Sequence, residues 1–123
     1  MRLHHVTHNI ARTNVDRARR FYSELLGLKE IEPIGDPSNQ RLIWFSIADQ
    51  QLHLVLRDQA DAASSRHLAF FVEDFPELIT RLETANVLLD EMKPGQHWST
   101  RPDGSKVAFC YDPDGNRIEL MGK

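Results

Sequence analysis

The stretch Arg66-His67-Leu68-Ala69-Phe70 decides the fold, because His4-His5-Val6-Thr7-His8 places polar and apolar residues in a similar order earlier in the chain. In the same way, Leu52-His53-Leu54 is matched by Ile118-Glu119-Leu120. These landmarks recur with a period of about 60 residues, which is typical of a duplicated module. The sequence therefore predicts one α+β pattern that is used twice.

We expect a single domain over residues 1–123, because a chain of this length suits one compact domain. Its first module covers about residues 1–57 and its second about residues 66–121, with a small polar linker between them. In each module the hydrophobic period predicts a strand, a helix and three further strands.

The first helix is expected over residues 14–26, with Asn14 as its N-cap and Gly27 in the left-handed conformation at its end. The second helix is expected to begin at Asp74 or Phe75, because a proline follows. Strands are expected near residues 2–10, 28–34, 41–47, 51–57, 66–73, 87–91, 105–111 and 116–121, with a loop over residues 35–39 and a turn over residues 112–115.

The composition excludes several classes of protein. Hydrophobic residues make up 41% of the chain and charged residues 27%, which is an ordinary mixture for a folded domain. The net charge is −3 and the basic residues are scattered, so no nucleic-acid partner is expected. There is no long apolar run, so no membrane association is expected. The single cysteine, Cys110, allows no internal disulfide, and a cytoplasmic location is the prediction.

Four residues stand out because each is a polar residue between apolar neighbours in a predicted strand: His5, His53, His67 and Glu119. Side chains alternate between the two faces of a strand, so the apolar neighbours should pack on the helices and the four should line the opposite face. Three imidazoles and one carboxylate suit a divalent ion such as zinc, nickel, iron, manganese or cobalt. A lone histidine is more often structural, but the matched placement in two modules favours a metal site.

The chain resembles the vicinal-oxygen-chelate superfamily, which includes glyoxalase I, bleomycin-resistance proteins and extradiol dioxygenases. The resemblance covers nearly the whole chain. The segments that carry it are His5-Val6, Arg20-Phe21-Tyr22, Leu25-Leu26-Gly27-Leu28, Leu52-His53-Leu54, His67-Leu68-Ala69-Phe70-Phe71-Val72-Glu73-Asp74, Asp112-Pro113-Asp114-Gly115-Asn116 and Ile118-Glu119-Leu120.

This resemblance implies two βαβββ modules that form curved mixed sheets around a central cleft. It also implies metal ligands from the first and last strands of each module, which are His5, His53, His67 and Glu119 here. At the position of Leu52-His53-Leu54, the pattern that glyoxalase I is expected to have is Leu-Glu-Leu. A site of only His5, His67 and Glu119 is therefore also consistent with the family.

The activity that the resemblance implies is metal-dependent chemistry on a small oxygenated substrate. A glyoxalase-type lyase or isomerase comes first, with Glu119 as the catalytic base, and an extradiol dioxygenase second. The alternative is a metal-free protein that sequesters a drug or metabolite, as bleomycin-resistance proteins do. A homodimer is expected, and the site could be built within one chain or across the dimer.

Four further residues are expected to line the substrate site: Thr7, Asn9, Trp44 and His97. Thr7 and Asn9 share the predicted face of His5, although polar strand residues are commonly just solvated. Trp44 could wall the cleft. His97 lies in a predicted loop, where an exposed histidine without function is the commoner case. His4 and His8 fall on the opposite face and are expected not to bind metal.

Overall fold

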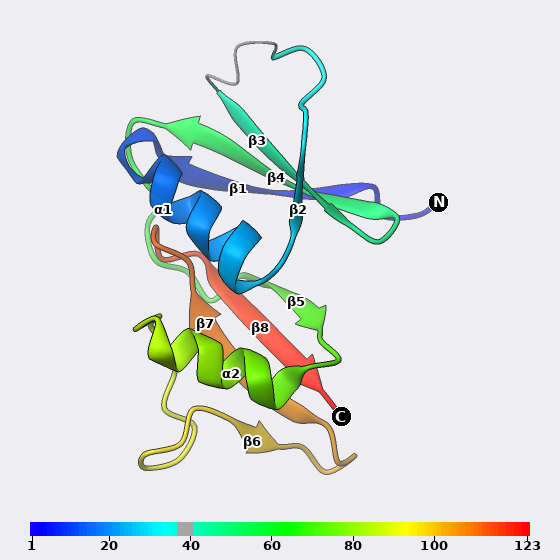
Figure 1. Cartoon of the computed structure of the whole chain (residues 1–123), viewed down its shortest axis with the longest axis vertical. Helices are drawn as coiled ribbons and strands as arrows, with labels where there is room; N and C mark the ends of the chain where they lie inside the picture. Colours follow the sequence, from blue (N-terminus) through cyan, green and yellow to red (C-terminus); the bar gives the residue numbers. More distant parts are fainter. Residues whose placement is uncertain (37–40) are drawn as a thin grey trace. The chain divides into compact units, whose positions relative to one another are not determined.

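A computed structural model describes residues 1–36 and 41–123, which form two compact units, Met1–Ala62 and Ala63–Lys123. Each unit contains a four-stranded mixed sheet with a helix along one face (Figure 1). This arrangement confirms the predicted α+β fold class. Most of the loop that was expected over residues 35–39 lies outside the described residues.

The sheet of the first unit has the strand order β1-β4-β3-β2. Strand β1 runs parallel to β4, whereas β4, β3 and β2 pair antiparallel. The bounds of these strands are β1 (His5–Ala11), β2 (Lys29–Ile31), β3 (Leu42–Ile47) and β4 (Gln50–Arg57).

The first helix differs from the expected regular α-helix over residues 14–26. It begins with a 3-10 turn (Arg12–Asn14), continues as α1 (Val15–Arg19) and ends as a π-helical segment (Arg20–Leu25). Asn14 does not cap it, and its Oδ1 instead accepts a 3.4 Å hydrogen bond from Arg17. The widened last turn places Phe21 and Tyr22 side by side in the core. As expected, Gly27 follows with φ of 78°.

The sheet of the second unit has the order β5-β8-β7-β6, with β5 parallel to β8. Helix α2 (Phe75–Thr84) buries Leu78, Ile79 and Leu82 against it. The helix approaches β8 so closely that a Cβ on Gly122 would lie 2.5 Å from the Cβ of Phe75. The strands are β5 (His67–Phe71), β6 (Ser99–Thr100), β7 (Lys106–Tyr111) and β8 (Arg117–Gly122).

The prediction of a strand near residues 87–91 is wrong. That segment makes only an isolated bridge, from Leu89 to Cys110. The chain turns back on itself between Lys93 and Gln96, so pairing with β7 does not continue. The fourth strand of this sheet is instead Ser99–Thr100, which pairs with the other end of β7.

Each sheet therefore has one apolar face against its helix and one face turned away from the helix. In β8, for example, Ile118, Leu120 and Gly122 are buried on the helix side, while Arg117 and Glu119 alternate with them. Among the helices of the described residues, none combines the length and the apolar character that crossing a membrane requires.

Candidate metal and substrate site

The strand register gives the four predicted ligands equivalent positions in their two sheets. In the first unit, Thr7 on β1 pairs with His53 on β4. In the second unit, Ala69 on β5 pairs with Glu119 on β8. His5 lies two residues before Thr7 on β1, and His67 lies two residues before Ala69 on β5. Each histidine is therefore on the same strand face as that residue. Each unit therefore supplies one pair of candidate ligands: His5 with His53, and His67 with Glu119.

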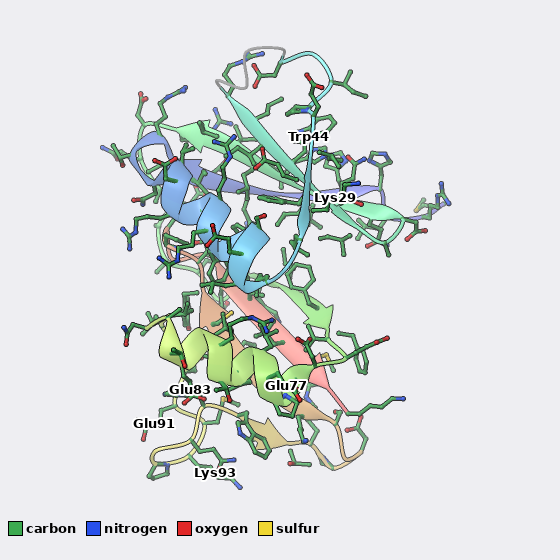
Figure 2. All side chains as sticks on the ribbon, in the orientation of Figure 1. Lys29, Trp44, Glu77, Glu83, Glu91 and Lys93 are labelled. Carbon is green, nitrogen blue, oxygen red and sulfur yellow. The ribbon has the colours of Figure 1, made fainter. Side chains whose placement is uncertain are left out.

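The first pair forms part of a stack of three rings. His5 and His53 have ring centroids 4.1 Å apart, and the indole of Trp44 lies parallel to His53 on its other side at 3.9 Å. Trp44 is the register partner of His53 on β3 and is labelled in Figure 2. Its Nε1 is buried without a hydrogen-bond partner. The stack leaves His53 only 7% exposed.

His53 is held in the neutral form. The pKa of His53 is lowered from 6.5 to about 4, mainly by burial of the ring and then by electrostatic interaction with His5 and with His4. Its Nε2 donates a 2.8 Å hydrogen bond to Oε1 of Gln51, which can only accept. The proton on Nε2 leaves Nδ1 with the free lone pair, and a neutral imidazole is the form that binds metals.

His4 and His8 lie in surroundings that differ from each other. Nδ1 of His4 lies 2.9 Å from Nδ1 of His5, so one ring donates to the other. His8 points to the helix side, where its Nδ1 is 3.4 Å from the hydroxyl of the buried Tyr22. That neither of them binds metal stays a prediction.

The second pair makes a direct polar contact. Nε2 of His67 lies 3.0 Å from Oε2 of Glu119, and Nδ1 of His67 lies 3.0 Å from the backbone carbonyl of Ser65. A carbonyl only accepts, so Nδ1 carries a proton and Nε2 is the nitrogen turned to the carboxylate. A histidine that donates one ring N–H to a carbonyl is the usual arrangement of a metal ligand, because it fixes the tautomer.

Glu119 also meets a guanidinium. The guanidinium of Arg101 forms an ion pair with Oε1 of Glu119, so each carboxylate oxygen has a partner. Glu119 is 6% exposed, and a buried carboxylate needs such compensation. The sequence analysis missed Arg101, because it precedes Glu119 by 18 positions in a turn with no recognisable motif.

Arg117 and Phe109 support the same pair. The Phe109 ring meets the His67 ring edge to face at 5.5 Å, and the guanidinium of Arg117 lies over Phe109 at 4.0 Å. Asp90 fixes Arg117 through a 3.1 Å contact to its Nη2 and also accepts a 2.8 Å hydrogen bond from the hydroxyl of Tyr111. These contacts hold the His67 ring in one orientation.

The contact between His67 and Glu119 has the length of an ordinary hydrogen bond, and this length is also compatible with two ligands of one ion. With bonds of about 2.1 Å, two ligand atoms at a right angle on one ion lie about 3.0 Å apart. The 3.0 Å between Nε2 of His67 and Oε2 of Glu119 matches this separation. Within each unit, as far as its residues are described, no three His, Cys, Asp or Glu side chains gather as a metal-holding group. Each pair therefore supplies two donors.

Two of the predicted substrate-lining residues lie on the same strand face as His5. Thr7 is exposed and pairs in register with His53. Asn9 donates to Oδ2 of Asp61 at 3.0 Å, and its Oδ1 accepts from Arg57 at 3.4 Å. The role of these residues toward a substrate stays a prediction.

His97 lies in a different part of the second unit. Its Nδ1 is 3.7 Å from Oε2 of Glu83, near the end of α2, and Figure 2 labels Glu83 there. Because α2 packs on the buried face of the sheet, this contact is on the side that Glu119 points away from. The structure therefore does not bring His97 together with His67 and Glu119, and its predicted role at the substrate stays a prediction.

Comparisons with known proteins agree with this fold. A glyoxalase family protein from Bacillus anthracis is 27% identical with a TM-score of 0.81, over 100% of this chain and 95% of that one. One from Enterococcus faecalis is 28% identical with a TM-score of 0.73, over 98% and 96%. Lactoylglutathione lyase from Agrobacterium tumefaciens, at 20% identity and a TM-score of 0.68 over 98% and 92%, shares the fold. None of the curated proteins compared with this chain matches it.

The family assignment comes from the sequence profile that matches. The profile of the Glyoxalase/Bleomycin resistance protein/Dioxygenase superfamily matches residues 2–120, which is nearly the whole chain. This chain therefore belongs to the Glyoxalase/Bleomycin resistance protein/Dioxygenase superfamily.

Proposed function

We propose that this protein is a divalent-metal-dependent enzyme of the glyoxalase type that acts on a small oxygenated substrate, as a lyase or isomerase. The observation that carries the proposal is the contact between Nε2 of His67 and Oε2 of Glu119 at 3.0 Å. Two donors of complementary type, one of them in a fixed tautomer, are part of the donor set that a zinc- or nickel-like ion takes.

The proposed ligands are His5, His53, His67 and Glu119. The depressed pKa of His53, about 4, keeps its imidazole neutral and able to bind. A set without His53 stays open, because Gln51 already occupies one of its nitrogens. A bound ion would act as a Lewis acid toward substrate oxygens, which stabilises negative charge as it develops.

Glu119 is the proposed base as well as a proposed ligand, and the first role requires that it leaves the ion transiently. Lyase and isomerase chemistry beside a carbonyl needs a carboxylate that takes a proton from one carbon of the substrate and returns it to a neighbouring atom. Glu119 is 6% exposed, and its two oxygens face His67 and Arg101. Its position excludes bulk water, while these two cationic or hydrogen-bonding partners keep the carboxylate oriented.

Two other functions have observations in their favour. Two histidines and one carboxylate are the set that suits ferrous iron, and His67 with Glu119 would supply one histidine and the carboxylate. Dioxygenase activity on a catechol is therefore the second enzymatic candidate. In contrast, both oxygens of Glu119 are already paired, and the unpartnered Nε1 of Trp44 offers a donor beside a flat ring surface. These features favour metal-free binding of a drug or metabolite.

The test begins with protein purified without a histidine tag and stripped of metal. Titration with Mn²⁺, Ni²⁺, Zn²⁺ and Fe²⁺ should show one ion bound per chain, and the loaded protein is then offered hemithioacetals and catechols. Glu119→Gln should weaken metal binding by roughly 10-fold or more, since disturbing ligand shells has this effect. Glu83→Gln is the matched control, because Glu83 also faces a histidine but on the helix side.

Two outcomes decide between the proposals. If no ion binds in any titration, the enzyme proposal is overturned and metal-free sequestration takes its place. If an ion binds and Glu119→Gln leaves its affinity unchanged while Glu83→Gln weakens it, the ligand set is wrong.

The remaining expectations belong to the same proposal. We expect a homodimer in the cytoplasm, and sedimentation of the metal-loaded protein would show its oligomeric state. Because the ligand set draws on both units, His53→Gln and Glu119→Gln should each reduce the metal content if both pairs hold the same ion.

A further inference from the structure

Arg101 combines a backbone that is fixed in a turn with a side chain that is partly exposed. Its N–H donates to the carbonyl of Ser105 at 2.7 Å, and its own carbonyl accepts from Gly104 at 2.9 Å. Asp103 tightens this turn by accepting hydrogen bonds from both the backbone N–H and the hydroxyl of Ser105. The Arg101 side chain is 41% exposed, although its guanidinium reaches the buried Glu119. The turn therefore anchors a partly exposed cation beside the proposed site.

The ion pair between Arg101 and Glu119 competes with metal binding, a point that rests on the proposed function. Arg101 neutralises a carboxylate that is almost fully buried. A divalent ion on Glu119 would take over this neutralisation, and its charge would repel the guanidinium at short range. Arginine stays protonated, so it cannot escape the repulsion by losing its charge. Metal binding should therefore release Arg101 from Glu119.

The neighbouring arginine is not released in this way. Arg117 lies opposite His67 in the strand register, but it is held by Asp90 at 3.1 Å and by the ring of Phe109 at 4.0 Å. Neither of those partners is a proposed metal ligand. Arg101 is therefore the arginine at this pair that would lose its partner when Glu119 binds an ion.

We propose that the released Arg101 binds a carboxylate of the substrate, so that the substrate is a small anionic molecule and its binding is coupled to that of the metal. The guanidinium already holds a carboxylate here, that of Glu119. Its planar fork of donors matches the two oxygens of such a group. A substrate carboxylate near the turn would restore the charge balance that the ion disturbs.

The competition between Arg101 and a metal ion for Glu119 is tested by metal binding alone. Mn²⁺ is titrated into metal-free wild type and into Arg101→Gln, and binding is followed by calorimetry. Arg101→Gln should bind Mn²⁺ roughly 10-fold more tightly, because a hydrogen bond to a charged group no longer has to be broken. Arg101→Lys keeps the charge and should remain closer to the wild type. Arg81→Gln is the matched control: Arg81 is 40% exposed and pairs with Asp74, away from Glu119.

The proposed binding of a substrate carboxylate by Arg101 is tested next with glycolate and its neutral analogue glycolamide. Mn²⁺-loaded wild type should bind glycolate at least several-fold more tightly than glycolamide, and Arg101→Gln should lose this preference while Arg81→Gln keeps it. If wild type binds no Mn²⁺, the proposed function itself fails. If Mn²⁺ binds but Arg101→Gln changes neither its affinity nor the preference for glycolate, the inference about Arg101 is overturned and the metal proposal stands.

Discussion

Acidification should destabilise this protein through His53, which is buried between His5 and Trp44. The pKa of His53 is lowered from 6.5 to about 4 in the folded state, mainly by burial. In the unfolded chain the imidazole is hydrated and titrates near its ordinary value. Between these two values the unfolded state binds more protons than the folded state, so the free energy of unfolding decreases as the pH falls.

The size of the effect follows from the difference between the two pKa values, 6.5 and about 4. At about 1.4 kcal/mol per pKa unit, this difference corresponds to a loss of at most ~3–4 kcal/mol. The stabilisation is fully present above pH 6.5, is lost progressively as the pH falls, and changes no further below about pH 4. With urea m-values of about 1–3 kcal/mol/M, the midpoint of unfolding should fall by roughly 1–4 M at most.

The assay is urea unfolding of the metal-free protein at several pH values, for wild type and for His53→Gln. Carboxylates titrate in both proteins, so the difference between their two pH profiles isolates His53. His97→Gln is the control, because His97 is a partly exposed histidine on the other unit. The reasoning is refuted if wild type and His53→Gln lose the same stability between pH 7 and 4.

Three further predictions concern stability and are read by urea unfolding at pH 7. Gly122→Ala should cost roughly 1–3 kcal/mol, because its Cβ would lie 2.5 Å from the Cβ of Phe75; unchanged stability would argue against this packing of α2. Asn86 has φ of 58°, so Asn86→Ala should cost about 1 kcal/mol and Asn86→Gly less, and the reverse order would contradict the left-handed conformation. Tyr111→Phe should cost about 1 kcal/mol by leaving Asp90 without a 2.8 Å hydrogen bond; no loss would mean that water replaces it.

Most of the fold follows from local pattern. The apolar stripe of α2 and the turn at residues 112–115 are readable from the sequence, because helical and strand periods differ and the turn needs particular residues. The strand near residues 87–91 was predicted wrongly because its formation depends on more than its own local pattern. Its apolar residues fit a strand, but backbone pairing is a property of two segments, and the tight turn at Lys93 ends it after a single bridge at Leu89.

The sequence by itself determined which side chains share a strand face, because alternation is fixed by the backbone of each strand. That is why His53 and Glu119 could be singled out, each between two leucine or isoleucine neighbours. Only the tertiary structure decided which residues meet them. The register that pairs Thr7 with His53, the stacking of Trp44 and the ion pair of Arg101 with Glu119 all join different strands or turns. Such contacts depend on how strands associate, and no local period encodes that association.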